Sequence, residues 1–535
     1  MNPDDTSSET EVLTADVIVI GGGPVGENVA QYAIEDTDLT AILVERELVG
    51  GECSYWACMP SKALLRPITV ADTASHLGGV SSPTLQNEEL LARRDEFVSH
   101  YDDSSQIEWT DSAGIQVVRG RARLVGEREV LVEQEADAGT DASEADASGT
   151  SASGADASGT SASEVEESGS ATAAGPLRLH ARRAVVLATG SAAVVPGPLS
   201  PARPWTSRDV TAVREVPDRL LIVGGGVVAV EAATWMAALG STVTMLVRGD
   251  RLLSGHEPFA GQHVREALEA AGVTIRFGTE AVSASRADGG EASRADAADD
   301  SARADDGDVG RLHGGPVTVT VQSADGQQEL SGDELLAATG RTPRLEGVGL
   351  ETVGLTADDV TSGSRPTWLH AVGDASGETP LTHWGKYRAR VIGERLRSEA
   401  LGQEPEPTVG TAVAPQVVFT DPQVAAVGMT ESQAREAGHQ VEVSQLPFGS
   451  AAGTALLRDD VTGTAQIVVD AQTHRLLGVT FVGPEAGEQI HAGTTAIVGQ
   501  VPVDALRHAV PAFPAASELW LNLLEQLPRQ MRRPA

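Results

Sequence analysis

The sequence is poor in cysteine, lysine and aromatic residues, and it contains no long apolar run. Two of its 535 residues are cysteine. This excludes a secreted fold held by several disulfides, and it excludes a zinc site with four cysteine ligands. No segment has the ~18–20 consecutive apolar residues of a membrane helix, so we expect no membrane partner. The acidic, polar residues 1–11 are typical of neither a secretory signal nor a transit peptide, which predicts a cytoplasmic protein.

Positive charge is also scarce. The chain has 39 basic and 76 acidic residues, a net charge of −37, and Lys62 and Lys386 are its only lysines. Phosphate backbones are bound by lysine- and arginine-rich surfaces, so nucleic acid is excluded as a partner. An acidic, lysine-poor surface with 3% aromatic residues stays hydrated in concentrated salt, which favours a halophilic protein. The alternative is a genome composition that favours arginine and alanine.

A glycine motif near the start predicts a dinucleotide site. Residues 16–20 form an apolar strand pattern, and Gly21, Gly23 and Gly26 follow at the spacing that opens a helix. Such glycines let the backbone approach a pyrophosphate, whose charge lies at the helix N-terminus. The next strand pattern ends at Glu45, where a carboxylate accepts hydrogen bonds from a ribose hydroxyl.

The same arrangement returns about 200 residues later, which predicts a second nucleotide. Gly224 and Gly226 follow an apolar strand pattern at residues 220–223. Its second strand ends at Val247, where a site for NAD presents a carboxylate, and Arg248 comes next. An arginine there is placed to hold a 2′-phosphate, so NADPH is favoured over NADH. The alternative is that Arg248 is a solvated surface residue.

The two cysteines lie five positions apart, directly after the first nucleotide unit. Cys53 and Cys58 belong to the run GGECSYWACMPSK, which ends at Lys62. Two cysteines at this spacing lack the other ligands of a zinc site. At the start of a helix they suit a reducible disulfide, because the helix dipole stabilises a thiolate. Lysine is so rare here that a compact ammonium is expected to be required at position 62.

Two stretches do not fit the surrounding fold pattern. Residues 135–175 and 285–315 are acidic, repetitive and without apolar periodicity, so we expect both to be disordered insertions. Each interrupts strand-like sequence. We therefore predict hairpins that pair 130–132 with 177–179, and 273–277 with 317–321.

Further motifs reveal a family resemblance. The cysteine run resembles the redox-disulfide signature of the pyridine nucleotide-disulfide oxidoreductases, the family of dihydrolipoamide dehydrogenase, glutathione reductase and mercuric reductase. Other motifs of this family follow in order: ATGS at 188–191, ATGR at 338–341, VGD at 372–374 and VFTDP at 418–422. The resemblance covers the chain except for its N-terminal tail and the two insertions.

The resemblance implies an α/β fold with two Rossmann-like domains and an α+β dimerisation domain. The FAD-binding domain would span 12–215 and the NAD(P)-binding domain 216–340. Residues 341–405 would return to the FAD domain, and 411–535 would form the dimerisation domain. The implied cofactors are FAD and NADPH (or NADH), and the implied assembly is a homodimer.

The resemblance also implies residue roles. Cys58 would be the charge-transfer thiolate that faces the flavin, Cys53 the interchange thiol, and Lys62 would lie near the flavin N5, paired with Glu231. Glu518 would belong to the acid–base pair, and no metal is expected. The implied cofactor-binding residues are Gly21, Gly23, Gly26, Glu45, Lys62, Gly120, Thr189, Gly190, Gly224, Gly226, Arg248, Gly340, Arg341 and Asp374.

Several residues depart from the family pattern. Phe513 stands where the family has the histidine of its acid–base pair, while Glu518 remains; His508 is the nearest alternative acid. Glu52 replaces a threonine beside the FAD phosphates, and Trp56 replaces a small residue before Cys58.

Three functions remain open at this stage. The first is a relay that carries electrons from NAD(P)H through FAD and the Cys53–Cys58 disulfide to a small disulfide substrate. The second is an NAD(P)H-dependent flavoenzyme that reduces a quinone or another small acceptor. The third is a redox-sensing flavoprotein with little turnover.

Overall fold

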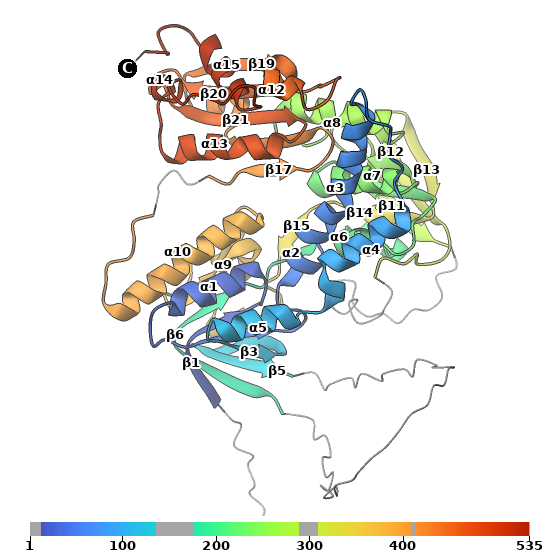
Figure 1. The fold of residues 1–535 in the computed structure, drawn as a ribbon. Helices are drawn as coiled ribbons and strands as arrows, with labels where there is room; N and C mark the ends of the chain where they lie inside the picture. Colours follow the sequence, from blue (N-terminus) through green and yellow to red (C-terminus); the bar gives the residue numbers. More distant parts are fainter. Residues whose placement is uncertain (1–11, 135–174, 288–308, 409–412, 534–535) are drawn as a thin grey trace, which may run out of the picture.

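The computed structural model describes residues 12–134, 175–287, 309–408 and 413–533 (Figure 1). The predicted insertion at 135–175 lies outside the described residues except for Gly175, and the central part of 285–315 also lies outside them. In the described ranges, none of the helices has both the length and the apolar character needed to cross a membrane.

The N-terminal domain is built on a parallel sheet. β1 pairs with β2 on one side and with β6 on the other, and β3 extends the sheet beyond β2. Ile18 and Ile20 point into one core and Val17 and Val19 into another, because both faces of a parallel sheet are covered. Helices α1 and α10 pack together on one face (Figure 1). The bounds are β1 (Val12–Ile20), β2 (Ala41–Glu45), β3 (Ile115–Arg119), β6 (Leu177–Leu187), α1 (Pro24–Ile34) and α10 (Thr382–Leu401).

On the side away from β1, the long strand β6 has two different partners along its length. Its first half pairs antiparallel with β5 (Glu129–Glu133), which also pairs with β4 (Arg121–Gly126). Its second half pairs in parallel with β16 (Leu369–Ala371). The predicted pairing of 130–132 with 177–179 is therefore confirmed. The contact with β16 and α10 shows that the segment after the second nucleotide unit returns to the first domain.

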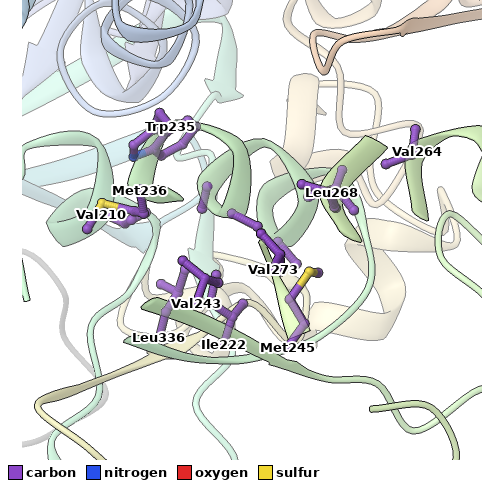
Figure 2. Close-up of a cluster of buried hydrophobic side chains, with 14 of the residues drawn as sticks. Val210, Ile222, Trp235, Met236, Val243, Met245, Val264, Leu268, Val273 and Leu336 are labelled. Carbon is purple, nitrogen blue, oxygen red and sulfur yellow. The ribbon is translucent and has the colours of Figure 1, made fainter. Parts of the chain in front are cut away.

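The second domain repeats a parallel sheet, in the strand order β10-β9-β8-β14. Helix α7 covers one face of it, and Figure 2 shows Trp235 and Met236 from this helix lying over Ile222, Val243 and Leu336 from the strands. The bounds are β8 (Arg219–Val223), α7 (Val227–Ala238), β9 (Thr242–Leu246), β10 (Thr274–Arg276) and β14 (Glu334–Ala337).

The second predicted hairpin is wrong. β10 pairs in parallel with β9, and it is β11 (Glu280–Arg286) that pairs antiparallel with β12 (Val317–Ser323), which then pairs with β13 (Gly326–Gly332). The predicted disordered insertion consequently begins inside a strand. Arg286 belongs to the repetitive polar sequence, yet its side chain is buried and forms an ion pair with buried Glu334. The ion pair with a residue distant in sequence thus allows this polar segment to form a strand with a buried side chain.

The C-terminal domain combines a five-stranded antiparallel sheet with helices, in the strand order β17-β18-β21-β20-β19. Helix α13 packs on β18 and β21. The bounds are β17 (Gln416–Val418), β18 (Gln423–Gly428), β19 (Val441–Pro447), β20 (Thr464–Asp470), β21 (Leu476–Gly483), α13 (Ala486–Val498) and α15 (Glu518–Gln526). The predicted fold class, two Rossmann-like domains followed by an α+β domain, is confirmed.

Candidate active site

The two cysteines lie at the junction of two helices and share one hydroxyl. Cys53 lies in the short helix α2 (Gly51–Tyr55), and Cys58 is the first residue of α3 (Cys58–Ser75). Both are free thiols in this structure. Thr382, the first residue of α10, has its Oγ1 at 3.3 Å from Cys53 Sγ and 3.4 Å from Cys58 Sγ. The sequence did not point to Thr382, which lies 324 positions from Cys58.

The two sulfurs differ in their affinity for a proton. A hydrogen bond from Cys53 lowers the pKa of Cys58 to about 6, with further help from Thr382 and the nearby Lys62 ammonium, although burial opposes it. The same hydrogen bond and burial raise the pKa of Cys53. The first-turn position of Cys58 adds the stabilising helix dipole. At neutral pH the reduced pair is therefore one thiol and one thiolate.

Lys62 connects all three domains beside this pair. Its Nζ lies 2.8 Å from Oε2 of Glu231 on α7, and Glu231 is buried. The other oxygen of Glu231 accepts a hydrogen bond of 2.9 Å from the Phe419 amide in the C-terminal domain. The ammonium also lies 4.8 Å from the centroid of the Phe419 ring. The structure thus brings the predicted partners Lys62 and Glu231 together one helical turn after Cys58.

Glycines form a bare backbone cradle at the carboxyl end of β1. Gly21 has a φ of +108°, and a Cβ there would lie 2.3 Å from the Ala188 carbonyl oxygen. A Cβ on Gly26 would lie 1.9 Å from the Gly21 oxygen. The loop before the cysteines approaches the same place, since a Cβ on Gly51 would lie 2.7 Å from the Gly23 Cα. Only glycines permit this approach of two backbones, which is the geometry of a pyrophosphate site.

Polar groups surround the cradle. Glu45 ends β2 and accepts a hydrogen bond of 2.6 Å from the Gly22 amide, and burial raises its pKa. Gly120 lies next to it, because its amide donates to the Glu45 carbonyl at 3.0 Å. Thr189 Oγ1 donates to the Arg344 carbonyl at 2.6 Å. Among the described residues, Arg344 Nη2 is a buried donor without a hydrogen-bond partner.

These features fit the diphosphate and ribose of FAD. The glycine backbone offers amides to a diphosphate, and Glu45 stands at the end of β2 where a ribose would lie. Asp374 extends the site, since Ser191 Oγ donates to its carboxylate at 2.5 Å. Gly190, with a φ of +72°, forms the turn between Thr189 and Ser191.

A second cleft opens over the carboxyl ends of β8 and β9. Its volume is about 930 Å³. The four residues predicted to bind NAD(P)H line it: Gly224, Gly226, Arg248 and Gly340. Arg341, another predicted cofactor-binding residue, lines it as well. Val247 also lines it but is buried, with a methyl group 3.0 Å from the position of a Cβ on Gly225. The cleft thus presents Val247 and not a carboxylate at the end of β9, while Arg248 is exposed and Asp250 and Glu280 lie elsewhere in the lining.

The predicted acid–base residues lie in the C-terminal domain, away from the cysteines of the same chain. Phe513 is 79% exposed, and His508 is also exposed. Glu518 accepts a hydrogen bond of 3.3 Å from the Gly453 amide and begins α15, which Figure 1 shows well separated from α2. One chain therefore does not bring Glu518 to Cys53 and Cys58.

Comparisons with known proteins agree with this geometry. Residues 15–384 match the family "pyridine nucleotide-disulphide oxidoreductase", and residues 414–523 match the dimerisation domain of the same family. The second match is consistent with the predicted homodimer. The chain is 30% identical to a dihydrolipoyl dehydrogenase of Thermus scotoductus, over 97% of this chain and 98% of the relative. It is 30% identical to the corresponding protein of Haloferax volcanii, over 97% of each chain.

Solved structures show the same fold. The HOCl-induced flavoprotein disulfide reductase RclA from Escherichia coli matches with a TM-score of 0.72 and 22% identity, covering 96% of this chain and 100% of that chain. LpdA from Mycobacterium tuberculosis matches with a TM-score of 0.73 at the same identity and coverage. Nothing in these similarities supports a quinone acceptor. The chain belongs to the pyridine nucleotide-disulphide oxidoreductase family and is an FAD-dependent NAD(P)H disulfide oxidoreductase.

Proposed function

We propose that this enzyme reduces a small disulfide, with Cys53 as the interchange thiol and Cys58 as the thiolate that faces the flavin. When bound, FAD supplies the two-electron link between the nicotinamide and the cysteine pair. The observation that carries the proposal is the cysteine pair itself: both sulfurs lie against the Thr382 hydroxyl, at the start of a helix that also presents Lys62.

The reaction with substrate proceeds in two exchanges. Cys58 takes the proton of Cys53, and the Cys53 sulfur bonds to one substrate sulfur while the other substrate sulfur leaves as a thiolate. Cys58 then returns to a thiolate and attacks Cys53, which restores the disulfide and releases the second thiolate. The substrate gains two electrons, and its two thiolates need two protons: Cys58 releases one, and the second comes from outside the pair.

Proton supply is where this enzyme differs from its family. Phe513 has no exchangeable proton, and Glu518 has no imidazole to orient. In the proposed homodimer the C-terminal domain of the partner would cover the substrate site, so Phe513 presents an apolar ring there. A general acid contributes ~10²–10⁴-fold to a step of this kind. We therefore expect disulfides of low-pKa aromatic thiols to be better substrates than alkyl disulfides.

The coenzyme proposed is NADPH. Val247 puts no carboxylate at the end of the second strand, and exposed Arg248, which lines the cleft, is placed to bind a 2′-phosphate. The glycines at 224 and 226 would approach its diphosphate. The proposed setting is a cytoplasm with high salt, and the net charge of −37 supports the adaptation to salt.

The cofactor-binding roles are part of the same proposal. Gly21, Gly23, Gly26 and Glu45 would hold the adenosine diphosphate half of FAD, and Asp374 its ribityl chain. Lys62 would lie near the flavin N5, held in place by Glu231. The remaining residues, Gly120, Thr189, Gly190, Gly340 and Arg341, would shape the walls of the two nucleotide sites.

Thiol counting and anaerobic titration test the proposal. Oxidised, unfolded protein should contain no free thiol, and two electrons per chain from NADPH should produce two thiols with a long-wavelength charge-transfer band. Cys58→Ser should abolish this band, whereas Cys53→Ser should keep a thiolate at Cys58 and so keep the band. Two free thiols in the oxidised protein would refute the relay.

A further inference from the structure

The helix that carries Cys53 is too short to hold its own position. α2 has five residues, begins after Gly50 in the left-handed region, and has no side-chain cap. Isolated helices of this length are unstable, because the entropy lost in forming the first turn exceeds the stabilisation from the few hydrogen bonds that one turn contains. The distance between the two cysteine sulfurs depends on where α2 lies relative to α3, so other contacts must fix it.

One buried arginine contacts α2 on both sides of Cys53. Arg208 is 4% exposed, and its Nε donates to Oε1 of Glu52 at 2.8 Å. Its guanidinium lies 4.4 Å from the centroid of the Trp56 ring. Its Nη2 donates to Glu47 at 2.9 Å, ahead of the helix. The guanidinium thus bonds to the Glu52 carboxylate and lies over the Trp56 ring at the same time.

The element that carries Arg208 is itself anchored. Arg208 lies in α6 (Ser207–Thr211), which begins with a capping box between Thr206 and Asp209. Thr211 Oγ1 donates to the Trp56 carbonyl at 2.9 Å, which adds a second bond between α6 and the turn between the cysteines. Side chains at 52 and 56, two of the positions where this chain departs from its family, thus meet at one residue.

We propose that Arg208 is a positioning residue that clamps α2 and thereby sets the reduction potential of the Cys53–Cys58 disulfide. The clamp holds Cys53 close to Cys58 and Thr382, so the two sulfurs of the reduced pair stay near enough to form the disulfide. A disulfide forms more readily the more its two sulfurs are held together, since closure then costs less entropy. This inference rests on the proposed function only in taking the cysteine pair as redox-active.

Loosening the clamp should shift the reduction potential of the disulfide in one direction. Reduction of the disulfide takes two electrons and, because Cys58 remains a thiolate, one proton. Arg208→Met removes the hydrogen bonds to Glu47 and Glu52 and the charge over Trp56, which allows Cys53 to move away. The disulfide then forms less readily, and its potential becomes less negative. A tenfold lower equilibrium constant for closure corresponds to about 30 mV.

The experiment compares FAD-loaded variants in thiol–disulfide buffers of set ratio, with the oxidised fraction measured by thiol trapping. Arg208→Met should lower the equilibrium constant for closure about tenfold and raise the pH at which the charge-transfer band titrates. Arg208→Lys, which keeps the charge but not the planar fork, should shift both in the same direction. Arg286→Met is the matched control, because it also removes a buried, ion-paired arginine but contacts neither α2 nor α6. It should leave the potential unchanged.

Milder variants keep the test open if Arg208→Met does not fold. Glu52→Gln and Trp56→Leu each remove one side of the clamp, and each should shift the equilibrium constant in the same direction by a smaller factor. An unchanged potential in Arg208→Met, or in both milder variants where it does not fold, would overturn the clamp. So would an equal shift in Arg286→Met. Any of these results leaves the relay intact, whereas free thiols in the oxidised unmodified enzyme would refute the relay itself.

Discussion

Replacing Thr382 by valine should raise the pKa of the reactive thiolate. Thr382 Oγ1 lies 3.4 Å from Cys58 Sγ and is one of the groups that hold the pKa of Cys58 near 6. A hydroxyl carries one hydrogen and serves one sulfur at a time, and a thiolate is the stronger acceptor. Valine has nearly the same shape but no hydrogen to donate, so the change isolates this bond.

The size of the effect follows from the value of one hydrogen bond to a charged group. Such bonds contribute about 1.5–3 kcal/mol, and a contact to sulfur at 3.4 Å belongs at the weak end. About 1.4 kcal/mol corresponds to one pKa unit, so we expect Cys58 to titrate about one unit higher in Thr382→Val. The thiolate fraction at neutral pH should fall accordingly.

The assay is a pH titration of the charge-transfer absorbance in the two-electron-reduced enzyme. Thr382→Ser keeps the hydroxyl and serves as the control, so its titration should remain close to that of the unmodified enzyme. If Thr382→Val titrates like the unmodified enzyme, the hydroxyl does not stabilise the thiolate. If Thr382→Ser shifts as far as Thr382→Val, packing of the methyl group is the cause instead.

Three further predictions follow from other sites. Arg248→Glu should lower kcat/KM for NADPH about 10- to 100-fold and favour NADH, since a charged contact of ~1.5–3 kcal/mol is lost; equal kcat/KM for both coenzymes in the unmodified enzyme would contradict this. Phe513→His should raise turnover of an alkyl disulfide at least about tenfold without changing reduction by NADPH, whereas fast alkyl turnover by the unmodified enzyme would reveal another acid. Burial raises the pKa of Glu27 from 4.5 to about 7, so the folded protein keeps a proton that the unfolded chain releases, and stability is lost as pH rises between these values. Glu27→Gln should remove about 3 kcal/mol of this pH dependence, as measured by denaturant unfolding at pH 4.5 and 8, and an unchanged dependence would contradict the assignment.

The nucleotide sites were predictable because their signals are local. A glycine at 21 or 26 is dictated by backbone atoms within the same strand–turn–helix unit or directly beside it. The cysteine pair is local as well, since five positions separate its members. The partnership of Lys62 with Glu231 spans 169 positions, and it was predicted only through the family resemblance.

Contacts between distant segments were not predictable from these patterns. Thr382 and Arg208 carry no motif that marks them, and their roles arise only where α10 and α6 meet α2. The second hairpin failed for a similar reason: the strand-like residues of β10 continue a parallel sheet, and β11 contains the polar Arg286, whose buried partner Glu334 is 48 positions away. The polarity of a segment does not show whether one of its charged side chains is buried in an ion pair with a distant residue.

Two departures from the family, Glu52 and Trp56, meet Arg208 at the clamp, and a third, Phe513, stands where the family has its acid–base histidine. Lys62 pairs with Glu231 and Thr382 contacts both cysteines, so the groups seen around the disulfide all come from one chain. At the position of the family's histidine, Phe513 offers no proton to a substrate thiolate that leaves. We therefore expect the half-reaction with NAD(P)H to be fast and the one with alkyl disulfides to be slow. An acceptor whose thiols leave without a proton satisfies both facts.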